Sequence, residues 1–423
     1  MIMKPVQAPL AAAAAVLAAV LVACAPAAAA PEFSGQVRPE WFMQSANGAG
    51  PVAQADALQP GVVAPPRGYG AVETELRASG HGLAFVGTER QQRIEGDRLR
   101  SHGWVNELYG STQAGGWQLS AGKRIVGWDV GYGFRPNDVV EQETRRTLLQ
   151  VTPEGRALLM AEHFTASTAW AFVLVNPTKR RAAPGPDEPA LAMRVYQRDG
   201  AVDWHGFARL GAHTGASVGA AAAWVASDAI ELHASLRYLT RGDTLANTAA
   251  NGGADATPLA ADPWRPVSVS HTAQALVGGT WTNAAQLSVL AEAWWDGTAL
   301  SDAQWDDWAA RNRGLAALVG APVPLPAIAG NLAWQANAFN ASTNLRRANL
   351  FGRVSWQYEK WQPSLDMLFT PADRGRVVTA ALGWQGDRLR VDAGLRVYGG
   401  PAQALLSQTP TRRVAYVAST WTF

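Results

Sequence analysis

The segment RLRVDAGLRVY, residues 388–398, alternates apolar and polar side chains without a break. One face carries Leu389, Val391, Ala393, Leu395 and Val397, and the opposite face carries Arg388, Arg390, Asp392, Gly394, Arg396 and Tyr398. Side chains of a β-strand point alternately to two sides, so this period of two predicts a strand with one apolar face. The pattern recurs at 33–44, 230–238 and 350–359, and the chain is therefore expected to be mostly β.

The length of these segments and of their connections favours a membrane barrel. Many segments span about 9–12 residues, enough for a tilted strand to cross a bilayer, whereas sandwich strands average about 5–6. Short turns, such as 386–387, alternate with long loops, such as 45–69, 129–155 and 297–344, as in outer-membrane barrels. The expected strands lie near 33–44, 70–79, 82–92, 97–110, 116–128, 156–164, 168–176, 189–198, 202–210, 217–226, 229–239, 273–282, 286–296, 346–359, 361–370, 377–385, 388–398 and 412–423.

The expected fold class is all-β, a single transmembrane antiparallel barrel over residues 31–423 with about 18 strands, within the range 16–18. Alternation alone leaves a soluble sandwich or propeller open, because such folds bury the apolar face that a membrane barrel turns toward lipid. An even strand number places both ends of the chain on the periplasmic side, with short periplasmic turns and long extracellular loops. Counting 331–338 as a strand breaks this parity, so we expect that segment in a loop. SDAQWDDWAARNRGLAAL (301–318), which begins with a capping Ser301, predicts one loop helix, lying on the rim or closing over the pore.

Residues 1–30 have the pattern of a secretory signal peptide. Lys4 precedes an apolar stretch, and small residues follow it, with a cleavage site expected near 27–29. LVAC (21–24) also matches the lipobox of bacterial lipoproteins, so lipid attachment at Cys24 is the alternative to plain cleavage. Cys24 is the single cysteine of the chain, which excludes an internal disulfide.

The composition argues against several classes of function. The formal net charge of +2 gives no basis for a nucleic-acid partner. The seven histidines show no metal-binding spacing, and neither a Gly-x-Ser-x-Gly elbow nor a phosphate-binding loop occurs. We therefore expect no enzymatic activity, no cofactor and no metal.

Charged side chains on the polar strand faces are the candidates for a pore lining. Arginine exceeds the acidic residues there, so a water-filled lumen would favour polar or anionic solutes. The alternative is that the charges pair across strands and hold the wall, each exposed pair contributing about 0–1 kcal/mol. The expected pore-lining residues are Arg98, Arg100, Arg124, Arg353, Arg390, Asp392 and Arg396.

GWDVGYGFRPNDVVEQETRR, residues 127–146, is the densest candidate for a constriction. It follows a strand, holds Gly131 and Gly133 for tight turns, and carries many charges. Either it folds into the lumen and narrows the pore, or it is a solvated external loop. The expected constriction residues are Arg135, Asp138, Glu141, Arg145 and Arg146.

The last ten residues, VAYVASTWTF (414–423), form a strand that ends on an aromatic side chain. Phe423, Trp421, Val417 and Ala415 share the apolar face, which predicts a lipid-facing strand that closes the barrel against 33–44. Trp421 and Phe423 resemble the recognition signal that the barrel-assembly machinery reads.

Two stretches resemble known proteins. VNELYG (105–110) with WDVGYGFRPND (128–138), and the tail at 349–400, are similar to uncharacterised Gram-negative outer-membrane barrels of a porin-like or alginate-export-like family. The resemblance implies an 18-strand barrel in the outer membrane that contacts lipid and passes a small polar or anionic solute. The expected function is thus a channel for diffusion or export; the alternative is a non-conducting envelope scaffold, adhesin or membrane anchor. Glu107 falls on the apolar phase of its strand, which a bulge or the bilayer edge would explain.

Overall fold

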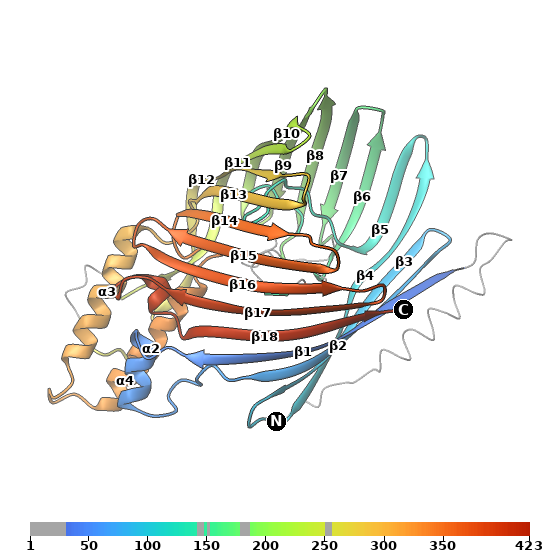
Figure 1. The fold of residues 1–423 in the computed structure, drawn as a ribbon. Helices are drawn as coiled ribbons and strands as arrows, with labels where there is room; N and C mark the ends of the chain where they lie inside the picture. The colour runs from blue at the N-terminus through green and yellow to red at the C-terminus, as the bar shows by residue number, and fades with distance from the viewer. Residues whose placement is uncertain (1–30, 142–147, 150–152, 178–186, 250–255) are drawn as a thin grey trace, which may run out of the picture.

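The computed structural model describes residues 31–141, 148–149, 153–177, 187–249 and 256–423. The chain forms one antiparallel sheet of 18 strands, in which each strand pairs with its neighbours in sequence (Figure 1). The last strand pairs back to the first, so the sheet closes into a barrel. The predicted strand number and parity are confirmed.

The strand boundaries follow the alternation of the sequence. The strands are β1 (Glu32–Ala46), β2 (Tyr69–Gly80), β3 (Leu83–Ile94), β4 (Leu99–Ala114), β5 (Trp117–Arg124), β6 (Arg156–Phe164), β7 (Thr168–Val175), β8 (Ala190–Asp199), β9 (Val202–Gly211), β10 (Gly215–Ser227), β11 (Ile230–Asn247), β12 (Trp264–Thr282), β13 (Leu287–Asp296), β14 (Ala348–Trp356), β15 (Trp361–Thr370), β16 (Gly375–Gln385), β17 (Leu389–Gly399) and β18 (Thr411–Thr422). β11 and β12 are longer than the predicted 229–239 and 273–282, because they continue to pair beyond the barrel as a hairpin.

All connections at one end of the barrel are short, and the start of β1 and the end of β18 lie at that end. The long loops lie at the other end, where the β3–β4, β9–β10 and β15–β16 connections are also short. The long-loop end carries the helices α2 (Pro51–Leu58), α3 (Asp302–Ala317) and α4 (Leu325–Trp334) (Figure 1). Single turns of 3-10 helix, η1 (Gln335–Asn340) and η2 (Leu405–Ser407), complete this end. None of the helices in the described ranges is both long and apolar enough to span a membrane.

The predicted loop helix is confirmed as α3. Ser301 accepts a hydrogen bond from the Gln304 backbone, and the Gln304 side chain accepts one from the Ser301 backbone, which makes a capping box. Trp305 and Trp308 of α3 share a buried cluster with Trp264, at the far end of the β11–β12 extension, so the helix is held at the long-loop end of the molecule. The segment 331–338 is helical, within α4 and η1, as its exclusion from the strands requires. The sequence did not predict α2 or α4.

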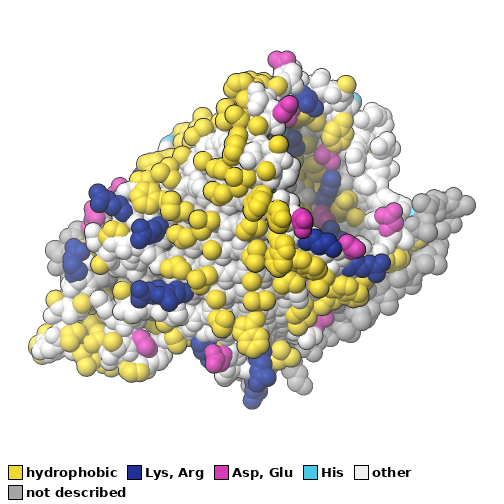
Figure 2. All heavy atoms as spheres, viewed as in Figure 1, with side chains coloured by type: hydrophobic (Ala, Val, Ile, Leu, Met, Phe, Trp, Pro, Cys, Tyr) yellow, Lys and Arg dark blue, Asp and Glu magenta, His cyan; other side chains and the backbone are white. Residues whose placement is uncertain are grey.

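The outer wall is an apolar belt. Large hydrophobic side chains are exposed on alternate strand positions, and the positions between them face inward. Figure 2 shows this belt over the middle of β14–β18 on one face of the barrel. Examples are Trp41 and Val417, which face each other where β1 meets β18, Leu191 on β8 and Leu365 on β15. A surface of this kind is stable in lipid, because apolar groups face the acyl chains while every strand edge is paired.

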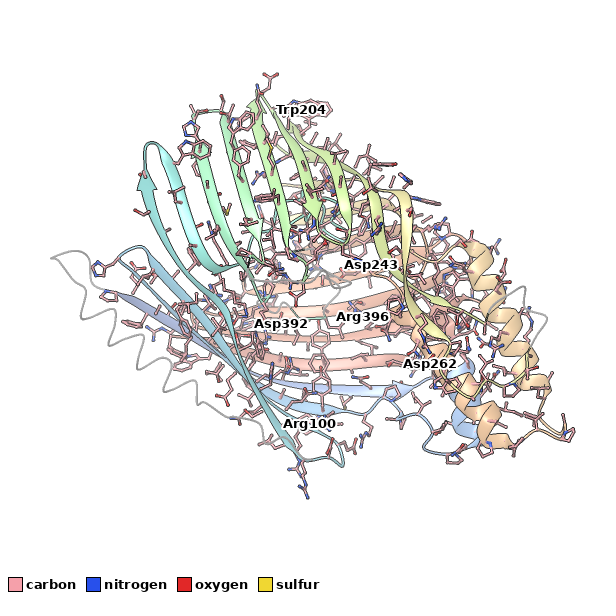
Figure 3. All side chains as sticks on the ribbon, turned by 180° about the vertical axis from the view of Figure 1, so that it is seen from behind. Arg100, Trp204, Asp243, Asp262, Asp392 and Arg396 are labelled. Carbon is pink, nitrogen blue, oxygen red and sulfur yellow. The ribbon has the colours of Figure 1, made fainter. Side chains whose placement is uncertain are left out.

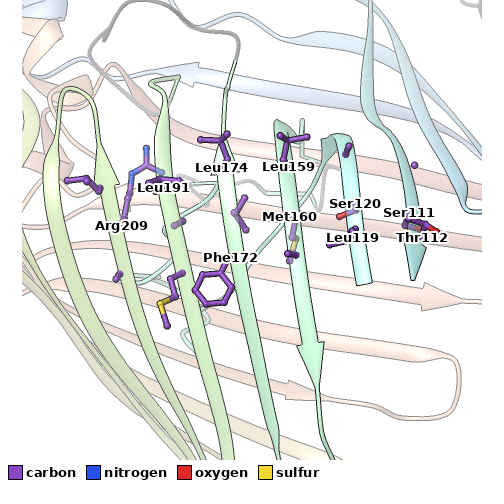
Figure 4. Close-up of a pocket in the computed structure, with 18 of the residues that line it drawn as sticks. Ser111, Thr112, Leu119, Ser120, Leu159, Met160, Phe172, Leu174, Leu191 and Arg209 are labelled. Carbon is purple, nitrogen blue, oxygen red and sulfur yellow. The ribbon is translucent and has the colours of Figure 1, made fainter. Parts of the chain in front are cut away.

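The belt is concave on the side formed by β4–β10. A groove of about 1090 Å³ lies there, lined by outward-facing side chains that include Leu159, Phe172 and Leu191 (Figure 4). Its lining is almost entirely apolar, as expected for a surface that acyl chains cover. This groove is therefore part of the outer wall and separate from the lumen.

A bulge brings Glu107 to the inner face. The pairing of β3 with β4 shifts between Val86 and Gly87, so that Val86 lies opposite Glu107. The Glu107 carboxylate then accepts a hydrogen bond from the backbone of Ile125, at 2.9 Å. The sequence left two explanations for Glu107 at an apolar strand position, a bulge or the bilayer edge. The bulge is confirmed.

The barrel closes at Phe423. Its backbone exchanges hydrogen bonds of 2.9 and 3.0 Å with Gly35 of β1, beyond the register that begins at the Gln36–Thr422 pair. A Cβ atom at Gly35 would lie 2.7 Å from the Phe423 ring, so the ring lies directly over this glycine. Phe423 also packs on Trp421, with ring centroids 5.2 Å apart. The predicted closure of the last strand against 33–44 is confirmed.

Replacing Phe423 with Ala is expected to lower the yield of folded barrel in the outer membrane. The substitution removes the aromatic contact that covers Gly35 at the seam, and the side chain that resembles the assembly signal. Heat-modifiable migration of membrane extracts on gels measures the folded fraction. Phe33→Ala is the matched control, since Phe33 is an exposed belt residue near the same end of β1. Equal folded yields for the two variants would show that the terminal ring has no special part in assembly.

Candidate functional site

The connection between β5 and β6, residues 125–155, enters the barrel. Its apolar residues are buried against the wall formed by β6–β9: Val126, Trp128, Val139 and Val140 pack with Leu158, Met160, Val173, Ala192 and Phe207. The intervening strand residues point the other way, and Leu159 and Leu191 are 49% and 57% exposed. The loop therefore covers the inner face of this wall. Burial of one such valine stabilises the packing by about 1.5–3 kcal/mol.

Glu292 of β13 anchors the tip of this loop. Its carboxylate accepts hydrogen bonds from the backbone N–H groups of Tyr132 and Gly133, both at 2.7 Å. His233 of β11 lies 2.9 Å from the same carboxylate. Glu292 and His233 are both buried, so the loop tip is tied to two strands through one acidic side chain.

A second anchor is centred on Asn137. Its amide donates to the Ser235 hydroxyl at 2.9 Å and to the Leu236 carbonyl at 3.0 Å. The space that it occupies exists because residue 219 of β10 is a glycine. A Cβ atom at Gly219 would lie 1.8 Å from the Asn137 side-chain oxygen. Next to it, the Arg237 guanidinium donates to the Pro136 carbonyl at 3.0 Å.

The same loop reaches the opposite wall. Leu148 and Leu149 pack against Phe42, Val414 and Tyr416, which belong to β1 and β18. These strands lie half of the 18-strand ring away from β9 and β10. The described parts of the loop, residues 125–141 and 148–149, therefore contact two opposed walls of the barrel.

Asp129 holds the two halves of the loop tip together. Its carboxylate accepts hydrogen bonds from the backbone N–H groups of Val130 and Asn137 and from the Ser235 hydroxyl. Burial raises the pKa of the Asp129 carboxyl, and these hydrogen bonds oppose part of that rise. The Asp129 carboxylate therefore holds the backbone of the loop tip in place, and its burial shields it from the lumen.

The expected constriction residues have different environments. Arg135 is partly buried and donates from Nε to the Gly131 carbonyl at 2.8 Å. Asp138 is buried, and Glu141 is buried while it accepts from the Val126 backbone at 3.1 Å. Arg145 and Arg146 lie outside the described residues. The described members thus stabilise the loop inside the barrel, and their charges are directed mainly at the protein.

Four of the expected pore-lining residues lie together on the inner face of β14–β17. Arg353 pairs with Asp366 at 3.0 Å, and Arg390 pairs with Asp392 at 2.8 Å. Arg396 donates from Nε to the Thr379 hydroxyl at 2.9 Å. The Arg353 guanidinium also lies 5.9 Å from the ring centre of Tyr132, which connects this wall to the loop tip. We call Arg353, Asp366, Arg390, Asp392 and Arg396 the charged wall.

The remaining expected pore-lining residues are elsewhere. Arg124 ends β5, where it pairs with Glu162 at 3.1 Å. Arg98 lies in the turn between β3 and β4, and Arg100 is 72% exposed at the start of β4, paired with Asp97. Figure 3 shows Arg100 at the tip of the hairpin, far from Asp392 and Arg396 on β17. Arg98 and Arg100 are therefore not part of the charged wall.

Several residues that shape the site were not among the predicted ones. They are Tyr132, Asn137, Gly219 and His233, together with the apolar loop residues Trp128, Val139 and Val140. The available signal was the hydrophobicity of Trp128 and of the pair Val139–Val140 within an otherwise charged loop. Such side chains indicate burial, which an external loop would not provide.

Comparison with solved structures identifies the fold. OccK5 (OpdH) of Pseudomonas aeruginosa aligns with a TM-score of 0.52 at 9% sequence identity, over 93% of this chain and 98% of that protein. The fold is a porin-like β-barrel. A triple mutant of the Rhodopseudomonas blastica porin aligns with a TM-score of 0.44 at 12% identity, over 93% of this chain and all of that protein. No protein-family model matches the chain, and no curated protein matches its sequence.

The porin fold and the apolar belt together indicate an outer-membrane protein. In this setting the inside of the barrel is the part that water can occupy, and the loop 125–155 and the charged wall are the features that shape it. These two features define the candidate functional site.

Proposed function

We propose that the barrel is an outer-membrane channel for diffusion or export of small polar solutes. The observation that carries this proposal is the inward loop, whose described residues contact two opposed walls of the barrel and lie beside the charged wall. Tyr132 at the loop tip is 50% exposed, and its ring stacks on Phe351 of β14 with centroids 5.8 Å apart. The loop tip thus contacts β14, and the narrow part of the channel is then the space between the loop and the inner face of β16 and β17.

The arginines of the charged wall support a preference for polar or anionic solutes. Two of its three arginines are paired with aspartates, which leaves local charge nearly balanced at those positions. Arg396 has the Thr379 hydroxyl as its hydrogen-bond partner and forms no ion pair with a described residue. Its positive charge is therefore available to the lumen, and charged groups that line a channel bias which ions pass.

To act as a channel, the protein must be exported across the inner membrane and assembled in the outer membrane. We propose that residues 1–30 act as the leader, although they lie outside the described residues, and that lipid on Cys24 remains the alternative. We also propose that Trp421 and Phe423, both exposed at the end of β18, are read by the barrel-assembly machinery.

A non-conducting barrel is the second candidate. The contacts of the loop with both walls favour it, because they reduce the open cross-section. The helices α2, α3 and α4 at the long-loop end add further mass there. In that case the barrel would serve as a scaffold, an adhesin or the membrane anchor of an envelope complex.

Single-channel recording in planar bilayers separates the two candidates. The channel proposal expects discrete conductance steps from purified, heat-modifiable protein, with a permeability ratio that favours anions over cations. Protein that is folded by the gel criterion and yet carries no current would exclude the channel and support the non-conducting barrel.

A further inference from the structure

The outer face of the barrel carries a cluster of arginines at its long-loop end. Figure 2 shows Lys and Arg side chains at the left ends of β14–β18, beside the apolar belt. Arg376 of β16 and Arg413 of β18 lie on this outer face, and Arg374 in the turn before β16 and Arg412 on β18 are exposed beside them. We propose that this arginine cluster binds the phosphorylated headgroup of an outer-leaflet glycolipid. The proposal depends on the outer-membrane location and is independent of whether the barrel conducts.

The sheet register brings two of these side chains to the same outer surface. Arg376 of β16 lies opposite Gly399 of β17, and Arg413 of β18 lies opposite Val397 of β17. The two arginines therefore flank β17, two strand spacings apart, a lateral distance of about 10 Å. Gly399 places no side chain beside Arg376, and Val397 lies beside Arg413 on the same face. At this spacing the two guanidinium groups can contact different phosphates of one headgroup.

Both arginines point outward. On β16 the residues on either side of Arg376, Gly375 and Val377, are buried, and Leu382 in the same phase as Arg376 is exposed. On β18, Val414 is buried and Val417, in the phase of Arg413, is exposed. The arginines are thus continuous with the apolar belt.

Their height matches the upper edge of the membrane. Arg413 and Trp421 lie eight residues apart in the same phase of β18, about 27 Å along the strand. With the usual strand tilt of about 40° this corresponds to a height of roughly 20 Å, close to the apolar band of about 25 Å in outer-membrane barrels. Trp421 marks the periplasmic edge of the belt, so Arg413 lies where the headgroups of the outer leaflet begin.

The cluster has no acidic partner among the described residues. No ion pair within those ranges involves Arg374, Arg376, Arg412 or Arg413. The nearest acid in sequence, Asp373, is engaged elsewhere: it pairs with Arg346 at 3.1 Å and accepts a hydrogen bond from the Leu405 backbone. Burial opposes ionisation of Asp373, but these hydrogen bonds and those from Thr370 and Gly375 hold its pKa below the ordinary value. Its charge is therefore directed inward.

The position of the arginine cluster beside the apolar belt favours a phosphorylated lipid over a free anion. Phosphate is the anion that guanidinium groups bind best, through paired N–H donors. A free anion has no reason to prefer an open surface beside an apolar belt. A lipid can place its phosphates on the arginines and its acyl chains on Leu382 and Val417, so both parts of the molecule are matched.

Native mass spectrometry of the folded barrel with bis-phosphorylated lipid A tests the proposal. We expect saturable binding to the wild-type protein, and Arg376→Ser/Arg413→Ser should weaken it roughly tenfold or more, since each basic residue near a membrane contributes about fivefold. Arg376→Lys/Arg413→Lys should retain most of the binding. Arg388→Ser is the matched control, because Arg388 is an exposed arginine in the β16–β17 turn at the opposite end and should leave binding unchanged. Heat-modifiable migration establishes that each variant is folded.

Three results would overturn the proposal. The first is binding by the double serine variant as tight as that of the wild type. The second is equal binding of dephosphorylated lipid A, which would assign the affinity to acyl contacts with the belt. The third is displacement of lipid A by inorganic phosphate alone, which would indicate a site for a free anion.

Discussion

The variant Gly219→Val is expected to raise the single-channel conductance severalfold. A Cβ atom at this position would lie 1.8 Å from the Asn137 side-chain oxygen and 2.7 Å from the Leu236 carbonyl oxygen, so the Asn137 side chain cannot remain in place. Valine is favourable in a strand, but the contact with the Leu236 carbonyl requires a local backbone shift between β10 and β11, so heat-modifiable migration must first show that the variant is folded. The loop would lose the anchor at Asn137, and each buried polar group left without its partner costs about 1–3 kcal/mol. Planar-bilayer recording measures the conductance, and limited proteolysis reports release of the loop.

Gly206→Val is the matched control for this experiment. Gly206 lies on the neighbouring strand, opposite Ala220, and a Cβ atom there would meet no other atom within 4 Å. Its conductance should equal that of the wild type. Asn137→Ala provides an independent route to the same state, because it removes the hydrogen bonds without a steric clash. If Gly219→Val is folded and conducts like the control, the loop does not limit the pore.

The strands of the barrel were predictable from the sequence because the pattern that marks them is local. Alternation of side chains along a strand requires only neighbouring residues, and it located all 18 strands. The predicted strand ends are wrong where two strands continue to pair beyond the membrane, because the bilayer thickness does not limit strand length there. Residues 240–247 and 264–272 extend β11 and β12 past the barrel, and their polar composition resembles that of a loop.

The inward course of the loop could be suggested by the sequence, but its contacts could not. Trp128 and Val139 need a buried surface, and the inner wall of a barrel is the surface available to a loop of this length. The pairing of Asn137 with the gap at Gly219 depends on the shear that brings β10 and β11 beneath residue 137. No periodicity in the sequence specifies that register.

The sequence also could not show which charged residues belong to the charged wall. Arg100 and Arg396 both occupy the polar phase of a strand, and alternation cannot distinguish them. Arg396 lies in the body of β17, whereas Arg100 follows the turn at the tip of the β3–β4 hairpin. Position along the barrel axis separates a luminal charge from a rim charge, and that position follows from strand ends, which are the least certain part of sequence-based assignment.

Reversing the charge at Arg390 and Arg396 is expected to reverse the ion preference of the channel. Arg390→Glu/Arg396→Glu replaces two positive charges with two negative ones beside Asp392 and Thr379. The new carboxylates cannot form ion pairs with Asp392 or Asp366, because these groups are also acidic. Asp366 stays paired with Arg353 at 3.0 Å, so the new charges face the lumen. Charged groups that line a pore set its ion selectivity, and the reversal potential in a salt gradient measures this directly. We expect it to change sign from anion-selective to cation-selective.

Arg100→Glu/Arg98→Glu is the control that makes this result specific. It changes the formal charge by the same amount, but on exposed residues at the tip of the β3–β4 hairpin. At an ionic strength near 1 M the Debye length is about 3 Å, so charges at the hairpin tip should have little effect on ions in the lumen. The reversal potential of this variant should stay close to that of the wild type. A shift equal to that of Arg390→Glu/Arg396→Glu would mean that the external charge of the barrel, and not the charged wall, determines which ions pass.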